Sequence, residues 1–265
     1  MIDSYSGATR VIFIAGDPIA QVKAPALATR TLRERGADAI VVPAHVLAQD
    51  LAAFMATVAR MPNVDGVIAT IPHKFEIARL CHAVTPRAAS IGAVNVVRRD
   101  AEGRWFGDMC DGEGYVVGLR KAGCEPAGRR ALLVGAGGAG CAIAHALVDA
   151  GVHALAVHDV DAARRDALMA RLEAYSALKP RIGSADPSGF DLVINATSMG
   201  MKASDPLPVD VAAIDPAAFV GDVVTVPAVP QLIEIARSRG LATMTGMGMF
   251  EAVRDCLVDF YLEAR

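Results

Sequence analysis

The sequence predicts an α/β fold with two successive domains. Short apolar runs alternate with stretches of helical periodicity between residues 11 and 82, which is typical of strands that alternate with helices. A second series of the same kind starts at residue 131, directly before a glycine-rich turn. No flexible linker or low-complexity segment separates the two series, so we expect the domains to join through structured elements. Strands and helices in alternation favour parallel sheets.

The first series predicts three strand–helix pairs followed by two short strands. Strands are expected at 11–15, 39–43 and 64–70, and helices at 24–35, 47–61 and 75–82. Gly16 ends the first strand and Gly36 stops the first helix. The shorter strands, at 92–97 and 104–106, flank a turn at 100–103, and a helix at 112–122 leads into the second series.

The second series begins with a strand at 131–134 and continues through strands at 154–158, 191–195, 219–224 and 241–244. A last helix is expected at 248–264. Apolar residues recur on this helix at helical spacing, which indicates ordinary core packing; they are Met249, Phe250, Val253, Cys256, Leu257 and Phe260.

The glycine-rich turn predicts a dinucleotide-binding unit. Gly135, Gly137 and Gly140 form the pattern G-x-G-x-x-G between a strand and a helix. The first glycine permits a tight turn, the second lets the backbone approach a pyrophosphate, and the third allows close packing of helix on strand. The pyrophosphate would lie at the N-terminus of the helix. The cofactor-binding turn therefore comprises Gly135, Ala136, Gly137, Gly138, Ala139 and Gly140.

An acid after the next strand predicts which dinucleotide binds. Asp159 follows Gly140 by 19 residues, near the usual place of the acid that accepts hydrogen bonds from the ribose hydroxyls of NAD. A carboxylate there would repel the 2′-phosphate of NADP. Arg164 and Arg165 come one turn later and could still reach such a phosphate. We therefore expect NAD as the cofactor, with NADP as the alternative.

Composition excludes several classes of function. The formal net charge is −3, so no electrostatic footprint for nucleic acid is visible. No apolar stretch reaches the ~20 residues that span a bilayer, and the N-terminus does not resemble a signal peptide. The five cysteines form no C-x-x-C pair, which predicts neither disulfides nor a metal site. We expect a cytoplasmic protein, monomeric or homodimeric, that acts on a small molecule.

Three polar residues of the first half point to oxidoreductase chemistry. Lys74 follows a strand at a strand-to-helix turn, Asn95 lies within a short apolar strand, and Asp111 lies where the first half passes into the second. Facing a nicotinamide, these groups could bind a secondary alcohol and take its proton while hydride leaves carbon. Taken singly, each has a plainer interpretation, as a surface lysine, a turn-fixing amide and a turn-forming acid.

Six ordered motifs resemble the shikimate/quinate dehydrogenase family over nearly the whole chain. Residues 16–25 resemble its N-terminal substrate motif, and residues 70–74 match T-x-P-x-K. The other matches are 91–95 with G-A-V-N, 110–112 with the end of N-T-D-G, 195–201 with N-x-T-x-x-G-M, and 246–249 with the motif that opens the last helix.

The resemblance implies a fold and a set of roles. It implies a substrate domain at 1–111 and 246–265, a Rossmann domain at 112–245, and a last helix that returns to the first domain. Lys74 and Asp111 would be the catalytic pair, with a relay in which Asp111 mainly orients Lys74 as an alternative. The substrate would be a cyclic hydroxy acid or polyol of aromatic amino acid biosynthesis. Further implied site residues are Val22, Lys23, Ala24, Thr70, Asn95, Thr225 and Val253 for the substrate, and Asn195, Thr197, Met199, Gly246 and Met249 for the cofactor.

The chain departs from the family pattern where the substrate carboxylate binds. Val22 and Ala24 stand at the positions of the motif S-x-S, Thr225 replaces a tyrosine and Val253 a glutamine. Hydrogen bonds to a charged group contribute about 1.5–3 kcal/mol each, so the loss of two or three costs on the order of 10²–10⁶ in specificity. Water or Lys23 could recover part of this loss, and Lys23 is the obvious candidate for a partner of the carboxylate. We expect weak activity on shikimate and better activity on a related ring.

Met109 and Cys110 likewise stand where N-T-D-G has its asparagine and threonine. Three rival interpretations remain open beside the altered dehydrogenase. One is a plain shikimate dehydrogenase with a pocket rebuilt around Gln21 and Lys23, and the second is an NAD-dependent quinate dehydrogenase. The third is an NAD-binding sensor module without turnover, which the presence of both Lys74 and Asp111 disfavours. A folate-type dehydrogenase fits the motifs less well.

Overall fold

The computed structural model describes residues 5–263, and this part of the chain divides into two compact units. Unit 1 contains the residues up to Cys110 together with those from Arg254 onward, whereas unit 2 is the continuous segment Asp111–Val253. The chain therefore passes from one unit to the other twice, after Cys110 and after Val253.

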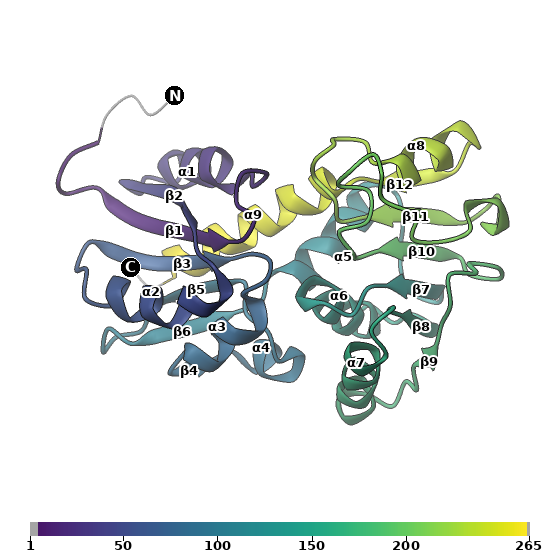
Figure 1. Ribbon diagram of the computed structural model, residues 1–265, viewed down its shortest axis with the longest axis horizontal. Helices are drawn as coiled ribbons and strands as arrows, with labels where there is room; N and C mark the ends of the chain where they lie inside the picture. The colour runs from purple at the N-terminus through teal and green to yellow at the C-terminus, as the bar shows by residue number, and fades with distance from the viewer. Residues whose placement is uncertain (1–4, 264–265) are drawn as a thin grey trace. The chain divides into compact units, whose positions relative to one another are not determined.

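Unit 1 is built on a six-stranded sheet with the order β2-β1-β3-β5-β6-β4 (Figure 1). Its strands are β1 (Arg10–Gly16), β2 (Ala39–His45), β3 (Val64–Ala69), β4 (Ala83–Val84), β5 (Val96–Arg99) and β6 (Trp105–Asp108). β1 is parallel to β2 and β3, but β5 runs antiparallel to both β3 and β6. The expectation of a parallel sheet is confirmed for β1, β2 and β3 and is wrong for β5. A short turn joins β5 to β6, and only antiparallel strands can be joined by such a turn.

The helices of unit 1 follow the predicted order with one addition. They are α1 (Ala24–Glu34), the 3-10 helix η1 (Ala48–Asp50), α2 (Leu51–Val58), α3 (Lys74–Leu80) and α4 (Pro86–Ile91). α1 buries Ala24, Ala28 and Leu32, which recur every fourth residue on one face. The six-residue α4 was not predicted, although Pro86 at its start and the side chain of Thr85, which accepts from the N–H of Ala88, are ordinary signals of a helix N-terminus.

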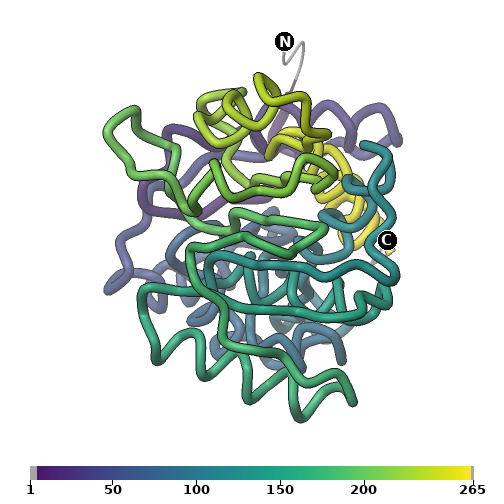
Figure 2. Tube along the Cα trace, turned by 90° about the vertical axis from the view of Figure 1, so that its right-hand side faces the viewer, coloured from purple at the N-terminus to yellow at the C-terminus, as the bar shows by residue number. Residues whose placement is uncertain are grey.

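Unit 2 is built on a parallel sheet with the order β12-β11-β10-β7-β8-β9 (Figure 1), as the alternation of strands and helices predicts. The strands are β7 (Arg130–Val134), β8 (Ala154–His158), β9 (Arg181–Ile182), β10 (Leu192–Asn195), β11 (Phe219–Asp222) and β12 (Ala242–Met244). The helices of this unit are α5 (Asp111–Lys121), α6 (Gly138–Asp149), α7 (Ala162–Tyr175), η2 (Val211–Ala213) and α8 (Gln231–Ser238). Their path can be followed from teal to green in Figure 2.

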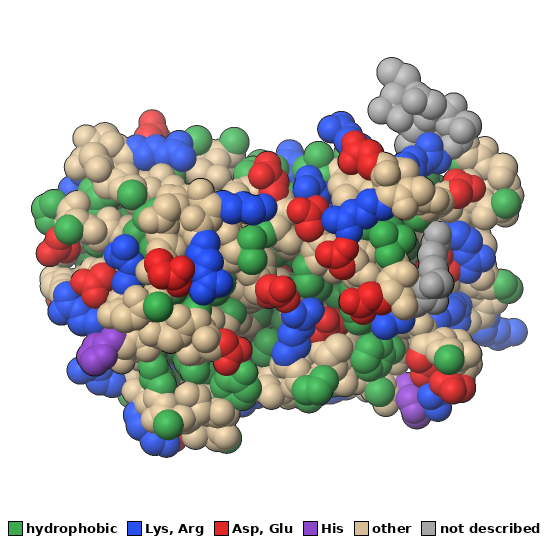
Figure 3. All heavy atoms as spheres, turned by 180° about the vertical axis from the view of Figure 1, so that it is seen from behind, with side chains coloured by type: hydrophobic (Ala, Val, Ile, Leu, Met, Phe, Trp, Pro, Cys, Tyr) green, Lys and Arg blue, Asp and Glu red, His purple; other side chains and the backbone are tan. Residues whose placement is uncertain are grey.

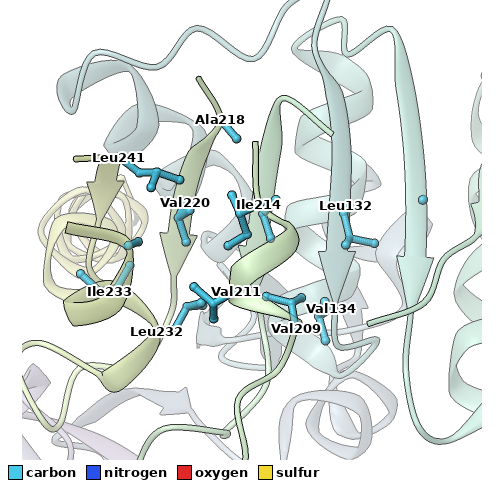
Figure 4. Close-up of a cluster of buried hydrophobic side chains, with 13 residues drawn as sticks. Leu132, Val134, Val209, Val211, Ile214, Ala218, Val220, Leu232, Ile233 and Leu241 are labelled. Carbon is cyan, nitrogen blue, oxygen red and sulfur yellow. The ribbon is translucent and has the colours of Figure 1, made fainter. Parts of the chain in front are cut away.

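One face of this sheet is covered by an apolar cluster that includes residues of η2 and α8. Leu132 and Val134 lie two residues apart on β7, so both point to the same face. Figure 4 shows them with Val220 of β11 and side chains from η2 and α8. The cluster consists of Leu132, Val134, Ala156, Val193, Val209, Val211, Ile214, Ala218, Val220, Leu232, Ile233, Ala236 and Leu241. It holds the strands that position the glycine-rich turn.

Helix α9 (Gly246–Leu262) contributes to both units, since the division falls between Val253 and Arg254. The predicted last helix, 248–264, begins two residues too late, and its last residue lies outside the described part of the chain. Within residues 5–263, no helix combines the length and apolarity that crossing a bilayer requires. Basic and acidic side chains are interspersed over the face shown in Figure 3.

Candidate active site

The glycine-rich turn of unit 2 has the geometry that the sequence predicts. Gly135 follows β7 with a φ of +108°, a backbone conformation that side chains disfavour. A Cβ atom on Gly140 would overlap the carbonyl oxygen of Gly135, whereas a Cβ on Gly137 would meet nothing within 4 Å. The space beside Gly137, at the N-terminus of α6, therefore suits the close approach of a pyrophosphate.

Hydrogen bonds hold Asp159 beside this turn, and one of them comes from the turn itself. One carboxylate oxygen accepts from the N–H of Ala136 at 2.6 Å, and the other accepts from the N–H of Asp161 at 2.8 Å. The negative charge is thereby held beside the turn. The two arginines that could counter it are engaged elsewhere, Arg164 with Asp161 at 3.2 Å and Arg165 with Asp166 at 2.8 Å.

Asn195 organises the loop after β10. Its buried side-chain oxygen accepts from the N–H of Thr197 at 3.0 Å and from the hydroxyl of the same residue at 2.7 Å. Its amide donates to the carbonyl of Met199 at 3.0 Å and to the carboxylate of Asp222 at 3.1 Å. Three predicted cofactor residues, Asn195, Thr197 and Met199, thus form one network at the end of a parallel strand, where ligands gather in such sheets.

Asp222 belongs to this network and is not among the site residues predicted from the motifs. It is the fully buried last residue of β11. Burial raises the pKa of Asp222 to about 6, although hydrogen bonds from Val224 and Asn195 oppose this shift. The sequence does carry a signal for it, since Asp222 is an acid inside the apolar run 219–224. A carboxylate buried in a strand needs hydrogen-bond partners, so its position indicates a polar network.

The remaining unit 2 candidates lie at or near the start of α9. Gly246 is its first residue, and a Cβ there would overlap the carbonyl oxygens of Val223 and Val224. Met249 and Val253 are buried on the helix, and Thr225 is half-buried after β11. Val253 packs so closely on α5 that a Cβ on Gly114 would overlap it.

Unit 1 brings Thr70, Lys74 and Asn95 together at the end of β3. The N–H of Ala69 donates to the carbonyl of Asn95 at 2.8 Å, and the N–H of Val94 donates to the carbonyl of Lys74 at 2.9 Å. These two bonds join the segment that carries Thr70 and Lys74 to the segment that carries Asn95. Lys74 is the first residue of α3, as the strand-to-helix turn predicts.

Asn95 lies directly before β5 and not within a strand, so that part of the prediction is wrong. The apolar residues around it extend the strand pattern beyond the paired segment. Its buried side-chain oxygen accepts from the N–H of Cys110 at 2.9 Å. This bond fixes the residue that directly precedes Asp111, the buried first residue of α5. Because Asp111 belongs to unit 2 and Lys74 to unit 1, their pairing stays a prediction.

The N-terminus of α1 carries the other substrate candidates. Ala24 is the buried first residue of the helix, Val22 is half-buried, and Lys23 lies at the N-cap position without a side-chain cap. Neither Val22 nor Ala24 can donate a hydrogen bond from its side chain. Within residues 5–263, no group of three His, Cys, Asp or Glu side chains could hold a metal ion.

A glycine-rich turn between the first strand and helix of a parallel sheet, with an acid fixed beside it, defines a dinucleotide-binding protein of the Rossmann class. Comparison with known proteins makes this more specific. Residues 14–97 match the family model described as the shikimate dehydrogenase substrate binding domain. A curated shikimate dehydrogenase (NADP(+)) of Rhodospirillum rubrum is 34% identical over 255 residues, covering 92% of this chain and 88% of that protein. The chain belongs to the shikimate dehydrogenase family.

Solved structures agree on the fold and differ in substrate. The quinate dehydrogenase of Corynebacterium glutamicum in complex with NAD is 27% identical, with a TM-score of 0.86 over 96% of this chain and 94% of that one. The ligand-free 5-ketofructose reductase of a Gluconobacter strain is also 27% identical, with a TM-score of 0.83 over 96% and 93%. The chain is therefore an oxidoreductase of the NAD(P)-dependent kind, within a fold that serves several substrates.

Proposed function

We propose that this protein catalyses reversible hydride transfer between NAD and a secondary hydroxyl of a cyclic polyol or hydroxy acid. The observation that carries the proposal is the joining of Thr70, Lys74 and Asn95 at the end of β3 in unit 1, in a chain whose unit 2 holds a dinucleotide turn. The ligand is a small molecule. A monomer or a homodimer stays our expectation for the assembly.

The residues divide the chemistry between them. The turn at 135–140 would hold the pyrophosphate on backbone N–H groups, and Asp159 would bind the ribose hydroxyls. The bound nicotinamide supplies the hydride acceptor. Thr70 and Asn95 would orient the substrate hydroxyls, and Lys74 with Asp111 would hold the proton of the reacting hydroxyl as carbon is oxidised.

The preference for NAD rests on Asp159. Hydrogen bonds from the N–H groups of Ala136 and Asp161 hold its negative charge beside the turn, and this charge would repel the 2′-phosphate of NADP. The Rhodospirillum relative is named for NADP(+), so this is the point on which the present chain is expected to differ.

We expect kcat/KM to be at least about tenfold higher with NAD than with NADP. A tenfold ratio corresponds to about 1.4 kcal/mol, which we assign to repulsion between Asp159 and the 2′-phosphate. Asp159→Ala should reduce this ratio mainly by weakening NAD. The matched control is Glu173→Ala, which removes another exposed acid of α7. Equal use of both cofactors by the unaltered enzyme would contradict the assignment.

The substrate preference rests on the apolar character of the implied carboxylate site. Val22, Ala24 and Val253 offer no side-chain donor, and Thr225 is the one hydroxyl among the substituted positions. A buried carboxylate without hydrogen bonds is strongly disfavoured. The similarity to a 5-ketofructose reductase supports a substrate with a different or absent acid group.

We therefore expect kcat/KM for shikimate to fall below the ordinary range of about 10⁴–10⁸ M⁻¹s⁻¹, and kcat/KM for at least one uncharged cyclic polyol or keto sugar to exceed the shikimate value. Steady-state rates followed by nicotinamide absorbance, on shikimate, quinate and neutral analogues, provide the measurement. Restoring the motif with Val22→Ser and Ala24→Ser should raise the shikimate rate. An ordinary shikimate rate in the unaltered chain would establish a plain shikimate dehydrogenase instead.

A further inference from the structure

Two cysteines from distant parts of the chain lie together in unit 1. Cys110 is fully buried, and Cys256 lies on α9 and is partly buried. The Nη2 atom of Arg87 is 4.0 Å from the sulfur of Cys110 and 3.6 Å from the sulfur of Cys256. Both sulfurs therefore lie around one nitrogen of the same guanidinium group. By contrast, the thiol of Cys81 donates to the carbonyl of Ile77 at 3.3 Å.

The guanidinium group beside the two sulfurs is held in place by a buried acid. Arg87 donates to the carboxylate of Asp108 through Nε at 2.7 Å and through Nη2, and the hydroxyl of Thr85 donates to the same carboxylate. Burial alone would raise the pKa of Asp108, but these hydrogen bonds lower it. Asp108 is therefore ionised, and it fixes a cation where it can stabilise a thiolate.

Cys110 and Cys256 lie in the two segments of the chain that connect unit 1 to unit 2. Cys110 is the last residue of unit 1 before the first passage to unit 2, and Cys256 is the third residue after the chain returns, counting Arg254 as the first. A bond between the two sulfurs would tie together the two segments that connect the units. It would also constrain Asp111, which directly follows Cys110.

We propose that Cys110 and Cys256 form a redox modification site that a peroxide converts into a disulfide. The partly exposed Cys256 gives up its proton and attacks the peroxide as a thiolate. The O–O bond breaks, a sulfenic acid forms, and the leaving hydroxide takes up that proton to give one water. The sulfur of Cys110 then attacks the sulfenic sulfur, the S–S bond forms, and its proton leaves with the hydroxide as a second water. In sum, two thiols are oxidised by two electrons and one hydrogen peroxide is reduced to two waters, and a dithiol reverses the change by exchange.

The order of the two steps follows from burial. A peroxide in solvent reaches Cys256 before Cys110, because the latter has no exposed surface. The neighbouring sulfur of Cys256 and burial both raise the pKa of Cys110 well above its usual value, so Cys110 stays a thiol until its partner has been oxidised. The side chain of Arg87 then stabilises the thiolate that attacks.

The test uses the fully reduced full-length protein, freed of reductant and treated with hydrogen peroxide. We expect the intact mass to fall by about 2 Da, the mass of two hydrogens, and the titratable thiols of the denatured chain to fall from its five cysteines to three. A non-reducing peptide map should contain one new species that joins Cys110 to Cys256, and dithiothreitol should remove it.

Cysteine variants identify the two residues that form the disulfide. Cys256→Ser and Cys110→Ser should each abolish the cross-linked peptide, whereas the matched control Cys81→Ser should retain it. Cys256→Ser alone decides the outcome if the buried Cys110→Ser variant does not fold. A disulfide between other cysteines, a disulfide between two chains, or oxidation that ends as sulfinic acid on Cys256 would overturn the proposal.

The consequence for turnover rests on the proposed function. Oxidation should lower kcat at least about tenfold, and dithiothreitol should restore it, because the bond constrains the segment that carries Asp111. A mapped disulfide with unchanged kcat would refute this effect. If the reduced protein turns over none of the substrates, the proposed function fails, while the mass measurement still decides whether the disulfide forms.

Discussion

Lys74→Met is expected to lower kcat by a factor of about 10²–10⁴ and to leave NAD affinity unchanged. Methionine keeps most of the apolar stem of lysine but can neither hold nor move a proton. Lys74 starts α3 in unit 1, whereas the dinucleotide turn belongs to unit 2, so the two functions should separate. Stopped-flow turnover and calorimetric titration of NAD measure them independently.

The matched control is Lys179→Met, which alters an exposed lysine in the loop after α7. It should leave both kcat and NAD affinity at the values of the unaltered chain. Undiminished turnover in Lys74→Met would remove this lysine from the mechanism. A protein that binds NAD but turns over no substrate, with or without Lys74, would be a binding module.

Gly140→Ala is expected to lower the stability of the protein, whereas Gly137→Ala is expected to weaken NAD binding. A Cβ atom added at position 140 would overlap the backbone of Gly135, and backbone cannot yield as a flexible side chain does. Forced overlap of this kind costs about 3 kcal/mol, or roughly 6–12 °C in Tm for a protein of this size. A methyl group at position 137 meets no atom within 4 Å, so stability should change little.

For NAD binding, the larger effect is expected at Gly137 and not at Gly140. Gly137 lies where the backbone must approach a pyrophosphate, so Gly137→Ala should weaken NAD binding about tenfold or more, a loss of roughly 1.4 kcal/mol. Differential scanning calorimetry without ligand and titration with NAD separate the two effects. Equal stability losses in both variants, or unaltered NAD affinity in Gly137→Ala, would show that the turn does not bind the cofactor as proposed.

The part of the fold that could be predicted is the part that depends on the pattern of residues within a single strand or helix. The central strands of unit 2, β7, β8, β10 and β11, are apolar on both faces, as parallel strands buried on both sides must be, and the sequence shows this directly. The direction of β5 is not local, since it depends on which strands its turn joins. The predicted start of β5 is too early because residues 92–95 are nearly as apolar as the strand itself.

The same distinction applies to the site. G-x-G-x-x-G encodes its turn within six residues, and the structure confirms the turn. The joining of Thr70 and Lys74 to Asn95 depends on strand order in unit 1, which the motifs indicated only through the family resemblance. The partnership of Arg87 with Asp108 spans 21 residues and has no local signature. Asp222 was detectable in principle as an acid inside an apolar run.

The discontinuity of unit 1 has a consequence for synthesis in the cell. Residues 111–253 form one uninterrupted unit and can fold as soon as they leave the ribosome, since domains fold as units during translation. Unit 1 is made first but lacks its segment from Arg254 onward until nearly the whole chain has emerged. Unit 1 should therefore stay incompletely folded, and accessible to chaperones, until after unit 2 has folded.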